Sequence, residues 1–320
     1  MNKIPITFSF DDNFVIAAGV CLSSLLENAK QDTFYDIFIL YSEINLSKKN
    51  RMSIMTIKEK YPNCNITYIN VGKAFENSYE IRNTTIAAYY RLLLPELISI
   101  YDKVIYSDVD IIFQDDLHNI YKSSLHSNQL IGGVCDGAVF SEDKWTKHHF
   151  NKLNCNPKKY INSGFLILNL KLMRDEHIVN IFKKHQNKKY YWQDQDIINI
   201  VCKGRIEIFP FKYNYTQIIY LYAHTNSKFS SNHQNEIFDA EQKGVIHYTI
   251  GKPWNSYCLR GDIWWEYYRK SIFYDKDYYY KTCSSITNKN IDIMPLKMLP
   301  KFILYRIRKK LFLIKSRFQG

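Results

Sequence analysis

The chain has 320 residues, of which 46% are hydrophobic and 23% are charged, and this composition excludes a disordered protein. No apolar run reaches the roughly 18 residues that a membrane span requires. The net charge of +12 indicates an acidic partner, which could be a nucleic acid, a nucleotide or an anionic membrane. The seven scattered cysteines contain no CxxC pair, and the first residues lead directly into a predicted strand. We therefore expect reduced thiols, no cleavable leader and a cytoplasmic location.

Strands and helices are predicted to alternate along the chain. Apolar runs, or alternating apolar and polar side chains, predict strands at residues 4–10, 36–41, 65–71, 104–106, 130–135 and 165–168. Helices are expected between the first four of them, at about residues 14–27, 47–60 and 86–98. This order favours a single Rossmann-like α/β domain with a mainly parallel sheet. The chain has neither a GxGxxG fingerprint nor a P-loop, so neither a dinucleotide site nor a Walker ATPase is indicated.

Two carboxylates follow the predicted strand at residues 104–106. Asp108 and Asp110 are spaced i, i+2, and alternate residues of an extended chain point the same way. Both can therefore face one cation just beyond the strand, where ligands bind in open α/β sheets. Paired carboxylates suit a hard divalent metal that also holds phosphate oxygens. An Asp-x-Asp triplet alone is a weak signal, and a solvated strand end is the alternative.

Polar segments around two later apolar runs could also carry chemistry. Asn162-Ser163-Gly164 is predicted to form a small turn before a strand, where a glycine allows close approach of a ligand. A simple turn explains it equally well. Residues 192–196 are expected to precede an apolar helix at residues 197–201. Asp194 could cap that helix, but the segment has more polar groups than a cap requires.

A histidine and a lysine near residue 250 form the next candidate pair. His247 is placed at the end of a strand, where a histidine is more often a buried core residue than a ligand. Lys252 follows Gly251 on a rigid turn and is well placed to contact a phosphate. The polar stretch at residues 225–236 is expected to be a flexible surface loop.

The last residues of the chain carry much of its charge. Residues 297–320 hold eight basic and no acidic side chains, so removing them from +12 leaves +4 for residues 1–296. This position disfavours a nucleic-acid-binding protein, whose basic residues would be spread over a binding surface. Apolar residues spaced by three and four predict an amphipathic helix that lies on an anionic membrane. The alternative is a terminal helix packed on the body. The apolar stripe consists of Leu304, Ile307, Leu311, Ile314 and Phe318.

Six motifs occur in a fixed order over roughly residues 4–270. They are Phe10-Asp11-Asp12-Asn13, Tyr89-Tyr90-Arg91-Leu92, Ser107-Asp108-Val109-Asp110, Asn162-Ser163-Gly164, Asp194-Gln195-Asp196, and His247-Tyr248 with Lys252-Pro253-Trp254. Together they resemble glycosyltransferase family 8, the retaining sugar-nucleotide transferases that include bacterial lipopolysaccharide α-galactosyl- and α-glucosyltransferases. The chain departs from the family in one respect. The family usually has one more residue between its histidine and the Lys-Pro-Trp motif, whereas here the glycine directly precedes Lys252. The resemblance implies a GT-A-like catalytic domain at residues 1–280 and a basic segment at residues 281–320.

The resemblance also implies roles for individual residues. Mn²⁺ or Mg²⁺ would be held by Asp108, Asp110 and His247. The uracil base would be read by Asp11 and Asn13 and stacked on Phe14. The donor sugar and its phosphates would lie near Arg91, Asp136, Asn162, Gly164, Gly251 and Lys252. The anomeric carbon would lie beside the catalytic residues Asp194 and Gln195.

The expected activity is metal-dependent transfer of a hexose from a UDP-sugar, with galactose favoured over glucose. The acceptor would be a glycan or glycolipid, such as lipopolysaccharide or another surface polysaccharide, at the inner face of the cytoplasmic membrane. Its contacts are expected from residues 137–160 and 213–236. Front-face substitution is favoured over double displacement because Gln195 is a poor nucleophile. The alternatives are an inactive transferase-fold interaction protein, which would be expected to lack a metal ligand, and a sugar nucleotidyltransferase, whose glycine-rich N-terminal loop is absent.

Overall fold

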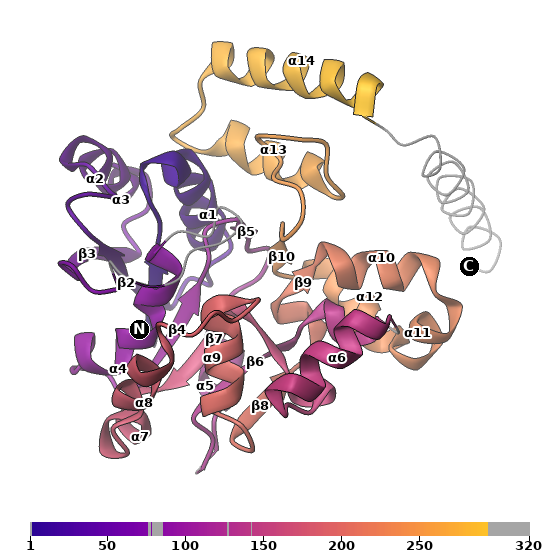
Figure 1. Ribbon diagram of the computed structural model, residues 1–320. Helices are drawn as coiled ribbons and strands as arrows, with labels where there is room; N and C mark the ends of the chain where they lie inside the picture. The colour runs from indigo at the N-terminus through magenta and orange to yellow at the C-terminus, as the bar shows by residue number, and fades with distance from the viewer. Residues whose placement is uncertain (1, 76–77, 79–85, 127, 142, 294–320) are drawn as a thin grey trace.

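The computed structural model describes residues 2–75, 78, 86–126, 128–141 and 143–293. Within these residues, seven strands form a central sheet in the order β3-β2-β1-β4-β7-β6-β8 (Figure 1). Their bounds are β1 Asn2–Ser9, β2 Thr33–Tyr41, β3 Cys64–Asn70, β4 Lys103–Ser107, β6 Ile131–Cys135, β7 Ile161–Asn169 and β8 Ile206–Phe209. The predicted sheet is therefore confirmed as mainly parallel, except that β7 runs antiparallel to both β4 and β6.

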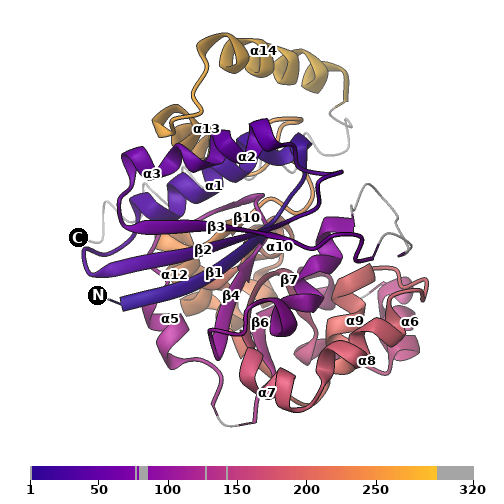
Figure 2. The same cartoon turned by 90° about the vertical axis from the view of Figure 1, so that its left-hand side faces the viewer.

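Helices cover both faces of this sheet, and alternate strand residues enter two separate cores. In β2, Ile37 and Ile39 pack into one core, whereas Phe38 and Leu40 pack into the other. Figure 2 shows α1 (Val15–Glu27), α2 (Lys48–Met55) and α3 (Ile57–Lys60) on one side of the sheet. The other side carries α7 (Leu170–Asp175), α8 (Ile178–His185) and α9 (Gln193–Val201). Burial of both faces explains why β2 is a nearly continuous apolar run.

The helix expected at residues 86–98 is replaced by two shorter elements. A 3₁₀ helix, η2 (Ile86–Leu93), leads into one turn of α-helix, α4 (Leu94–Leu97). Pro95 has no backbone N–H and cannot donate to the carbonyl of Arg91, which disfavours a continuous α-helix here but is tolerated in the first turn of α4. The prediction of a continuous helix was wrong because it ignored that missing donor.

Residues 225–236 form helices rather than the predicted loop. Asn226 caps α11 (Ser227–Asn232) by accepting a hydrogen bond from the N–H of Phe229 at 3.0 Å. The buried side chains of Phe229 and Ile237 anchor α11 and α12 (Gln234–Lys243) to the core. The polar residues of this segment therefore serve as caps and solvent-facing positions, which composition alone does not distinguish from a loop.

A second, three-stranded sheet links distant parts of the chain. Its central strand, β10 (Ile246–His247), pairs antiparallel with β5 (Ile111–Ile112) and parallel with β9 (Tyr215–Thr216). Each strand has only two residues, too few to show a period in the sequence. This small sheet brings His247 to the segment that follows β4.

Several further elements complete the described chain. They are η1 Asp12–Phe14, α5 His118–Ser123, η3 Gly137–Phe140, α6 Lys144–Leu153, η4 Pro157–Lys159, η5 Phe211–Tyr213, α10 Gln217–Thr225, α13 Gly261–Lys270 and α14 Lys276–Ile293. α13 packs on α1 through the fully buried Trp264. No helix in the described part of the chain is both long and apolar enough to cross a membrane. The basic segment at residues 297–320 lies outside the described residues.

Candidate active site

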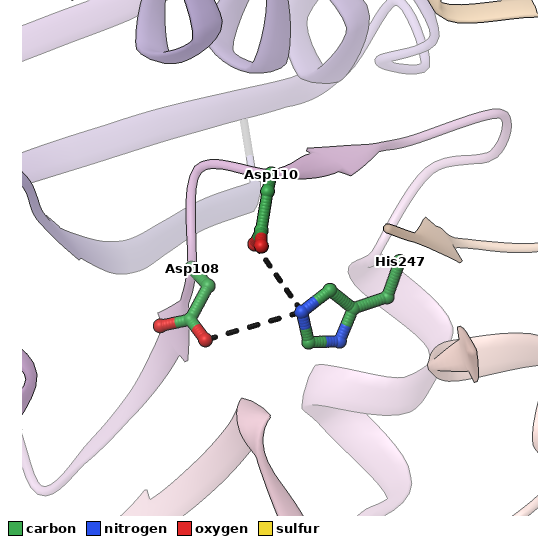
Figure 3. A group of neighbouring side chains, drawn as sticks. All are labelled: Asp108, Asp110 and His247. Carbon is green, nitrogen blue, oxygen red and sulfur yellow. Dashed lines mark ion pairs between the residues drawn. The ribbon is translucent and has the colours of Figure 1, made fainter. Parts of the chain in front are cut away.

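The two predicted aspartates and the histidine meet beyond the end of β4. Nε2 of His247 lies 3.2 Å from Oδ1 of Asp110 and 4.0 Å from Oδ2 of Asp108 (Figure 3). One oxygen from each carboxylate and one imidazole nitrogen all lie within 4.8 Å of one another. The pairing of β5 with β10 fixes this arrangement, and the N–H of Tyr248 also donates to the carbonyl of Asp110 at 3.0 Å.

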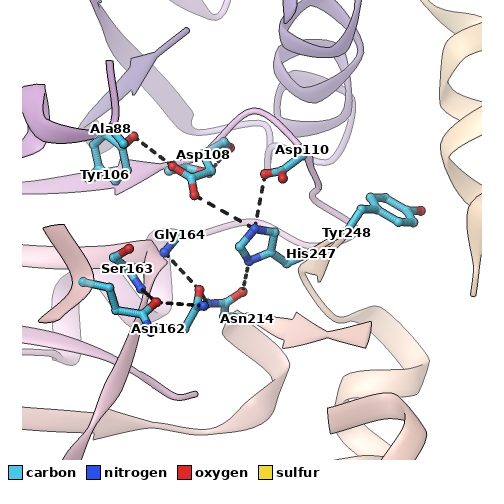
Figure 4. A network of polar contacts seen from close by, with 12 residues as sticks. Ala88, Tyr106, Asp108, Asp110, Asn162, Ser163, Gly164, Asn214, His247 and Tyr248 are labelled. Atoms are coloured by element: carbon cyan, nitrogen blue, oxygen red, sulfur yellow. Dashed lines mark hydrogen bonds and ion pairs between the residues drawn. The ribbon is translucent and has the colours of Figure 1, made fainter. Parts of the chain in front are cut away.

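A chain of amide hydrogen bonds sets the orientation of the His247 ring (Figure 4). The backbone N–H of Gly164 donates to Oδ1 of Asn162 at 3.0 Å, and this contact orients the Asn162 amide. The same Oδ1 also accepts from Nδ2 of Asn214 at 2.9 Å. Oδ1 of Asn214 then accepts from Nδ1 of His247 at 2.9 Å. Because Nδ1 carries the proton, the lone pair of Nε2 faces the two carboxylates.

These residues fit a bound divalent cation. Oδ1 of Asp110 is buried and has no hydrogen-bond partner among the described residues, and it faces a second acceptor atom, Nε2 of His247. A cation between the two atoms would satisfy both. An added Cβ on Gly164 would lie 2.2 Å from Cε1 of His247 and 3.0 Å from Oδ2 of Asp108. Only glycine therefore leaves room for the histidine at this place.

Lys252 lies beside one of these carboxylates, that of Asp110. Its ammonium group pairs with Asp110 and donates to the carbonyl of Tyr248 at 2.6 Å. Burial alone would raise the pKa of Asp110, but the charge of Lys252 holds it well below its usual range. The turn before the lysine is fixed by Gln217, whose Oε1 accepts from the N–H of Gly251 at 3.1 Å. The one-residue departure from the family spacing thus leaves the lysine next to the aspartate pair.

Arg91 bridges two carboxylates from different elements. It is buried, with Nη2 at 2.8 Å from Oδ1 of Asp108 and Nε at 3.2 Å from Oδ2 of Asp194. Its guanidinium lies 4.1 Å from the ring centroid of Tyr106, whose hydroxyl donates to Asp108 at 2.9 Å. Burial would lower the pKa of Arg91, but the two carboxylates raise it above its usual value, so the group stays charged.

Two of the motifs lie in other secondary-structure elements than those predicted from the sequence. Asn162-Ser163-Gly164 lies inside β7 rather than in a turn before a strand, because Ile161 already pairs with Cys135 of β6. Asp194 and Gln195 lie in the first turn of α9 rather than ahead of a helix that begins at residue 197. Asp194 does not cap this helix, whose N-cap is Trp192.

Gln195 is held at both ends of its amide. Its Oε1 accepts from Nδ2 of Asn162 at 3.1 Å and from the N–H of Ser163 at 3.0 Å. Its Nε2 donates to Oδ2 of Asp136 at 3.2 Å and to the hydroxyl of Tyr160 at 3.4 Å. Asp136 also accepts from Asn162 at 2.9 Å, so three predicted residues form one buried network.

Asp194 stands next to this network and is almost completely buried. Burial raises its pKa to about 6, against the opposing effect of the Arg91 charge. A carboxyl group with such a pKa changes its charge near neutral pH, which is characteristic of functional sites.

A cleft of about 290 Å³ has Asp194 and Gln195 in its lining, whereas Asp136, Tyr160 and Asn162 of the network lie outside the lining. Its lining includes seven of the predicted site residues, namely Asp11, Phe14, Arg91, Asp108, Asp110, Asp194 and Gln195. Phe14 is half-buried and meets the edge of Trp254 at 6.0 Å between ring centroids. Asn13 is exposed and lies outside the lining set; its N–H donates to Oδ1 of Asp11 at 2.8 Å.

Residues 5–258 match the sequence profile of Glycosyl transferase family 8. This chain belongs to glycosyltransferase family 8. The general stress protein A of Bacillus subtilis (strain 168) is 27% identical to this chain over 258 residues, which cover 77% of this chain and 85% of that protein. The lipopolysaccharide 1,3-galactosyltransferase of Salmonella typhimurium is 23% identical over 264 residues, with coverages of 80% and 74%.

A solved structure supports the same family 8 assignment. The galactosyltransferase LgtC, in complex with donor and acceptor sugar analogs, superposes with a TM-score of 0.72 and 26% identity. The match covers 87% of this chain and all of that one. The predicted family and the GT-A-type α/β fold are therefore confirmed, and the protein is a glycosyltransferase.

One residue that the family 8 motifs do not contain is Asn214. It is fully buried and connects His247 to Asn162, two motif residues that are distant in sequence. The sequence signal for Asn214 was a lone amide between two aromatic residues, Tyr213 and Tyr215. The pairing of β9 with β10 brings Asn214 next to His247, and the sequence alone does not show this pairing.

Proposed function

We propose that this glycosyltransferase transfers a hexose, galactose or glucose, from a UDP-sugar to a glycan or glycolipid acceptor with retention of configuration. The convergence of Asp108, Asp110 and His247, of which the two aspartates line the cleft, carries this proposal. Mn²⁺ or Mg²⁺ bound by these residues would act as a Lewis acid that neutralises charge on the leaving diphosphate. Lys252 adds a positive charge at the same place.

The donor would lie along the cleft with its base next to the residues that follow β1. Asp11 and Phe14 line that part of the cleft, and Asn13 is adjacent in the chain. A carboxylate and an amide can bond the N–H and carbonyl groups of uracil, and an aromatic ring can stack on the base. Arg91 would then hold Asp108 and Asp194 in place at the donor sugar and its phosphates.

Front-face substitution is the mechanism that the contacts of Gln195 favour. Both lone pairs of its Oε1 accept hydrogen bonds, which leaves none for attack on the anomeric carbon. Asp194 is paired with Arg91 and is suited to stabilise positive charge on the sugar rather than to bond to it. The bond to the diphosphate would break on the same face on which the acceptor oxygen bonds, and the acceptor proton would pass to the leaving phosphate.

The names of the relatives support a bacterial surface glycan as the acceptor class. The Salmonella relative is a lipopolysaccharide galactosyltransferase, and this chain has a basic segment at residues 297–320 suited to an anionic membrane. We therefore propose a glycolipid acceptor reached at the inner face of the cytoplasmic membrane, with this segment as the attachment and no role for nucleic acid.

A donor screen tests the proposed activity. The purified protein is incubated with a panel of UDP-sugars and Mn²⁺, and released hexose is measured. We expect hydrolysis of UDP-galactose or UDP-glucose, at least a 100-fold loss in Asp110→Asn, and no loss in Asp102→Asn, whose carboxylate is 79% exposed and remote in the fold from the cleft lining. Hydrolysis that survives in Asp110→Asn would contradict the proposed metal site.

A further inference from the structure

A second groove adjoins the active-site cleft on the side of α9. It has a volume of about 370 Å³ and is lined by residues of α6 and of the segment before α9, including Trp145, His148, His149, Lys152, Lys188 and Tyr191. Tyr191 also lines the active-site cleft, so the groove and the cleft lie on either side of a shared residue. We call this feature the α6 groove.

Two exposed aromatic side chains form its apolar part. Trp145 is 46% exposed and Tyr191 is 41% exposed, and their ring centroids lie 4.3 Å apart. Trp145 stacks on the ring of His149 with an interplanar angle of 12°. Large aromatic rings left exposed beside a catalytic cleft are characteristic of binding surfaces, and their flat faces suit the apolar face of a sugar ring.

The floor of the α6 groove is rigidly attached to the catalytic helix. Nε2 of His149 lies 3.1 Å from Oδ1 of Asp196, which has no exposed surface and also accepts from the hydroxyl of Tyr160. The other oxygen of Asp196 accepts from the N–H of Trp192 at 3.0 Å. Asp196 follows Gln195 directly in α9, so one helix positions both the catalytic amide and the floor of this groove.

The charge of the α6 groove has a single sign. His148, Lys152 and Lys188 are exposed, and Lys189 lines the same groove. Its described lining contains no carboxylate, and Asp196, the partner of His149, is fully buried. Three lysines around two exposed aromatic rings are complementary to a ligand that combines a sugar ring with negative charge.

We infer that the α6 groove binds an anionic sugar residue of the acceptor glycan, one that bears a phosphate or a carboxylate group. This inference rests on the proposed function, since it places an acceptor next to the donor cleft. The sugar ring stacks on Trp145 and Tyr191, and the anionic group contacts Lys152 and Lys188. The hydroxyl that receives the hexose then lies beyond Tyr191, in the active-site cleft.

Binding of defined saccharides tests the inference. Ligand-observed NMR titrations use trigalacturonate, glucose 6-phosphate, neutral maltotriose and inorganic phosphate as probes. We expect at least one acidic saccharide to bind at least tenfold more tightly than maltotriose and inorganic phosphate. The carboxylate and phosphate probes distinguish the two sources of charge. Equal affinity for maltotriose, or for inorganic phosphate, would overturn the inference.

Matched variants locate the binding. The double variant Lys152→Glu, Lys188→Glu should weaken the acidic saccharide at least tenfold, and Trp145→Ala at least fivefold. Lys147→Glu, an exposed lysine of α6 outside the groove lining, should stay within twofold of the wild type. Unchanged affinity in the double variant would overturn the inference. A thermal shift with UDP and Mn²⁺ verifies that each variant is folded, and its absence in the wild type would instead refute the proposed function.

Discussion

Oδ1 of Asn214 accepts a hydrogen bond from Nδ1 of His247 at 2.9 Å, and this contact aims Nε2 at Asp108 and Asp110. Asn214 is buried and is itself oriented by Asn162, whose own orientation follows from the backbone N–H of Gly164. The strand that carries the Asn-Ser-Gly motif therefore controls the tautomer of a histidine in the other sheet. Partners of this kind determine how well a histidine can bind a metal.

Asn214→Ala should weaken metal binding without unfolding the protein. Its loss leaves Nδ1 of His247 without its acceptor, and comparable partners change metal affinity by roughly 10- to 100-fold. Titration of Mn²⁺ in the presence of UDP, followed by thermal shift, should show a midpoint higher by about that factor. Asn214→Asp retains the acceptor and should lie closer to the wild type. An unchanged midpoint in Asn214→Ala would show that Asn214 does not position the ligand.

Asp194→Asn should reduce turnover at least 100-fold, because the variant loses negative charge beside the anomeric carbon. It should leave no trappable adduct, since front-face substitution forms no sugar–enzyme bond. Mass spectrometry of the wild-type protein with a slow donor checks this expectation. A hexose covalently attached to Asp194 would instead establish double displacement.

Asp194 should also make the free energy of unfolding depend on pH. Burial raises its pKa from 3.8 to about 6, so its contribution to stability is fully present below the lower value and is lost as the pH rises through the higher one. Between pH 4 and pH 7, the wild type should lose about 2 kcal/mol relative to Asp194→Asn. Urea unfolding of both proteins in EDTA measures the difference. A constant difference across this range would contradict the raised pKa.

Removal of residues 297–320 should abolish sedimentation with anionic vesicles while donor hydrolysis persists. The segment supplies eight of the basic side chains, and attraction of each to an anionic surface is worth about 1 kcal/mol. Vesicles of neutral lipid serve as the control. If the shortened protein sediments with anionic vesicles as the full chain does, the membrane attachment lies elsewhere.

The sequence predicted the architecture well where apolar patterns were long. The strands β1, β2 and β3 and the helix α1 were predicted to within a few residues, because their patterns extend over six or more positions. The continuous helix at residues 86–98 and the loop at residues 225–236 were wrong. In the first case Pro95 removes a donor, and in the second a few buried side chains decide the fold of a polar segment.

The candidate site was predictable only in its composition. The residue types in the motifs indicated the chemistry of the site. Their positions relative to one another depend on β5, β9 and β10, which have two residues each. Asn214 and the α6 groove were missed for this reason, since their significance comes from contacts between segments that are distant in sequence. The direction of β7 was also unpredictable, because its apolar run fits a parallel or an antiparallel neighbour equally well.

The most direct test of the account is the thermal stability of the protein with UDP, measured in Mn²⁺ and in EDTA, for the wild type and for His247→Ala. We predict that UDP raises the melting temperature of the wild type only when Mn²⁺ is present, and that His247→Ala shows no such rise. Stabilisation by UDP that is equal in EDTA, or that persists in His247→Ala, would contradict the assignment of Asp108, Asp110 and His247 as the metal site.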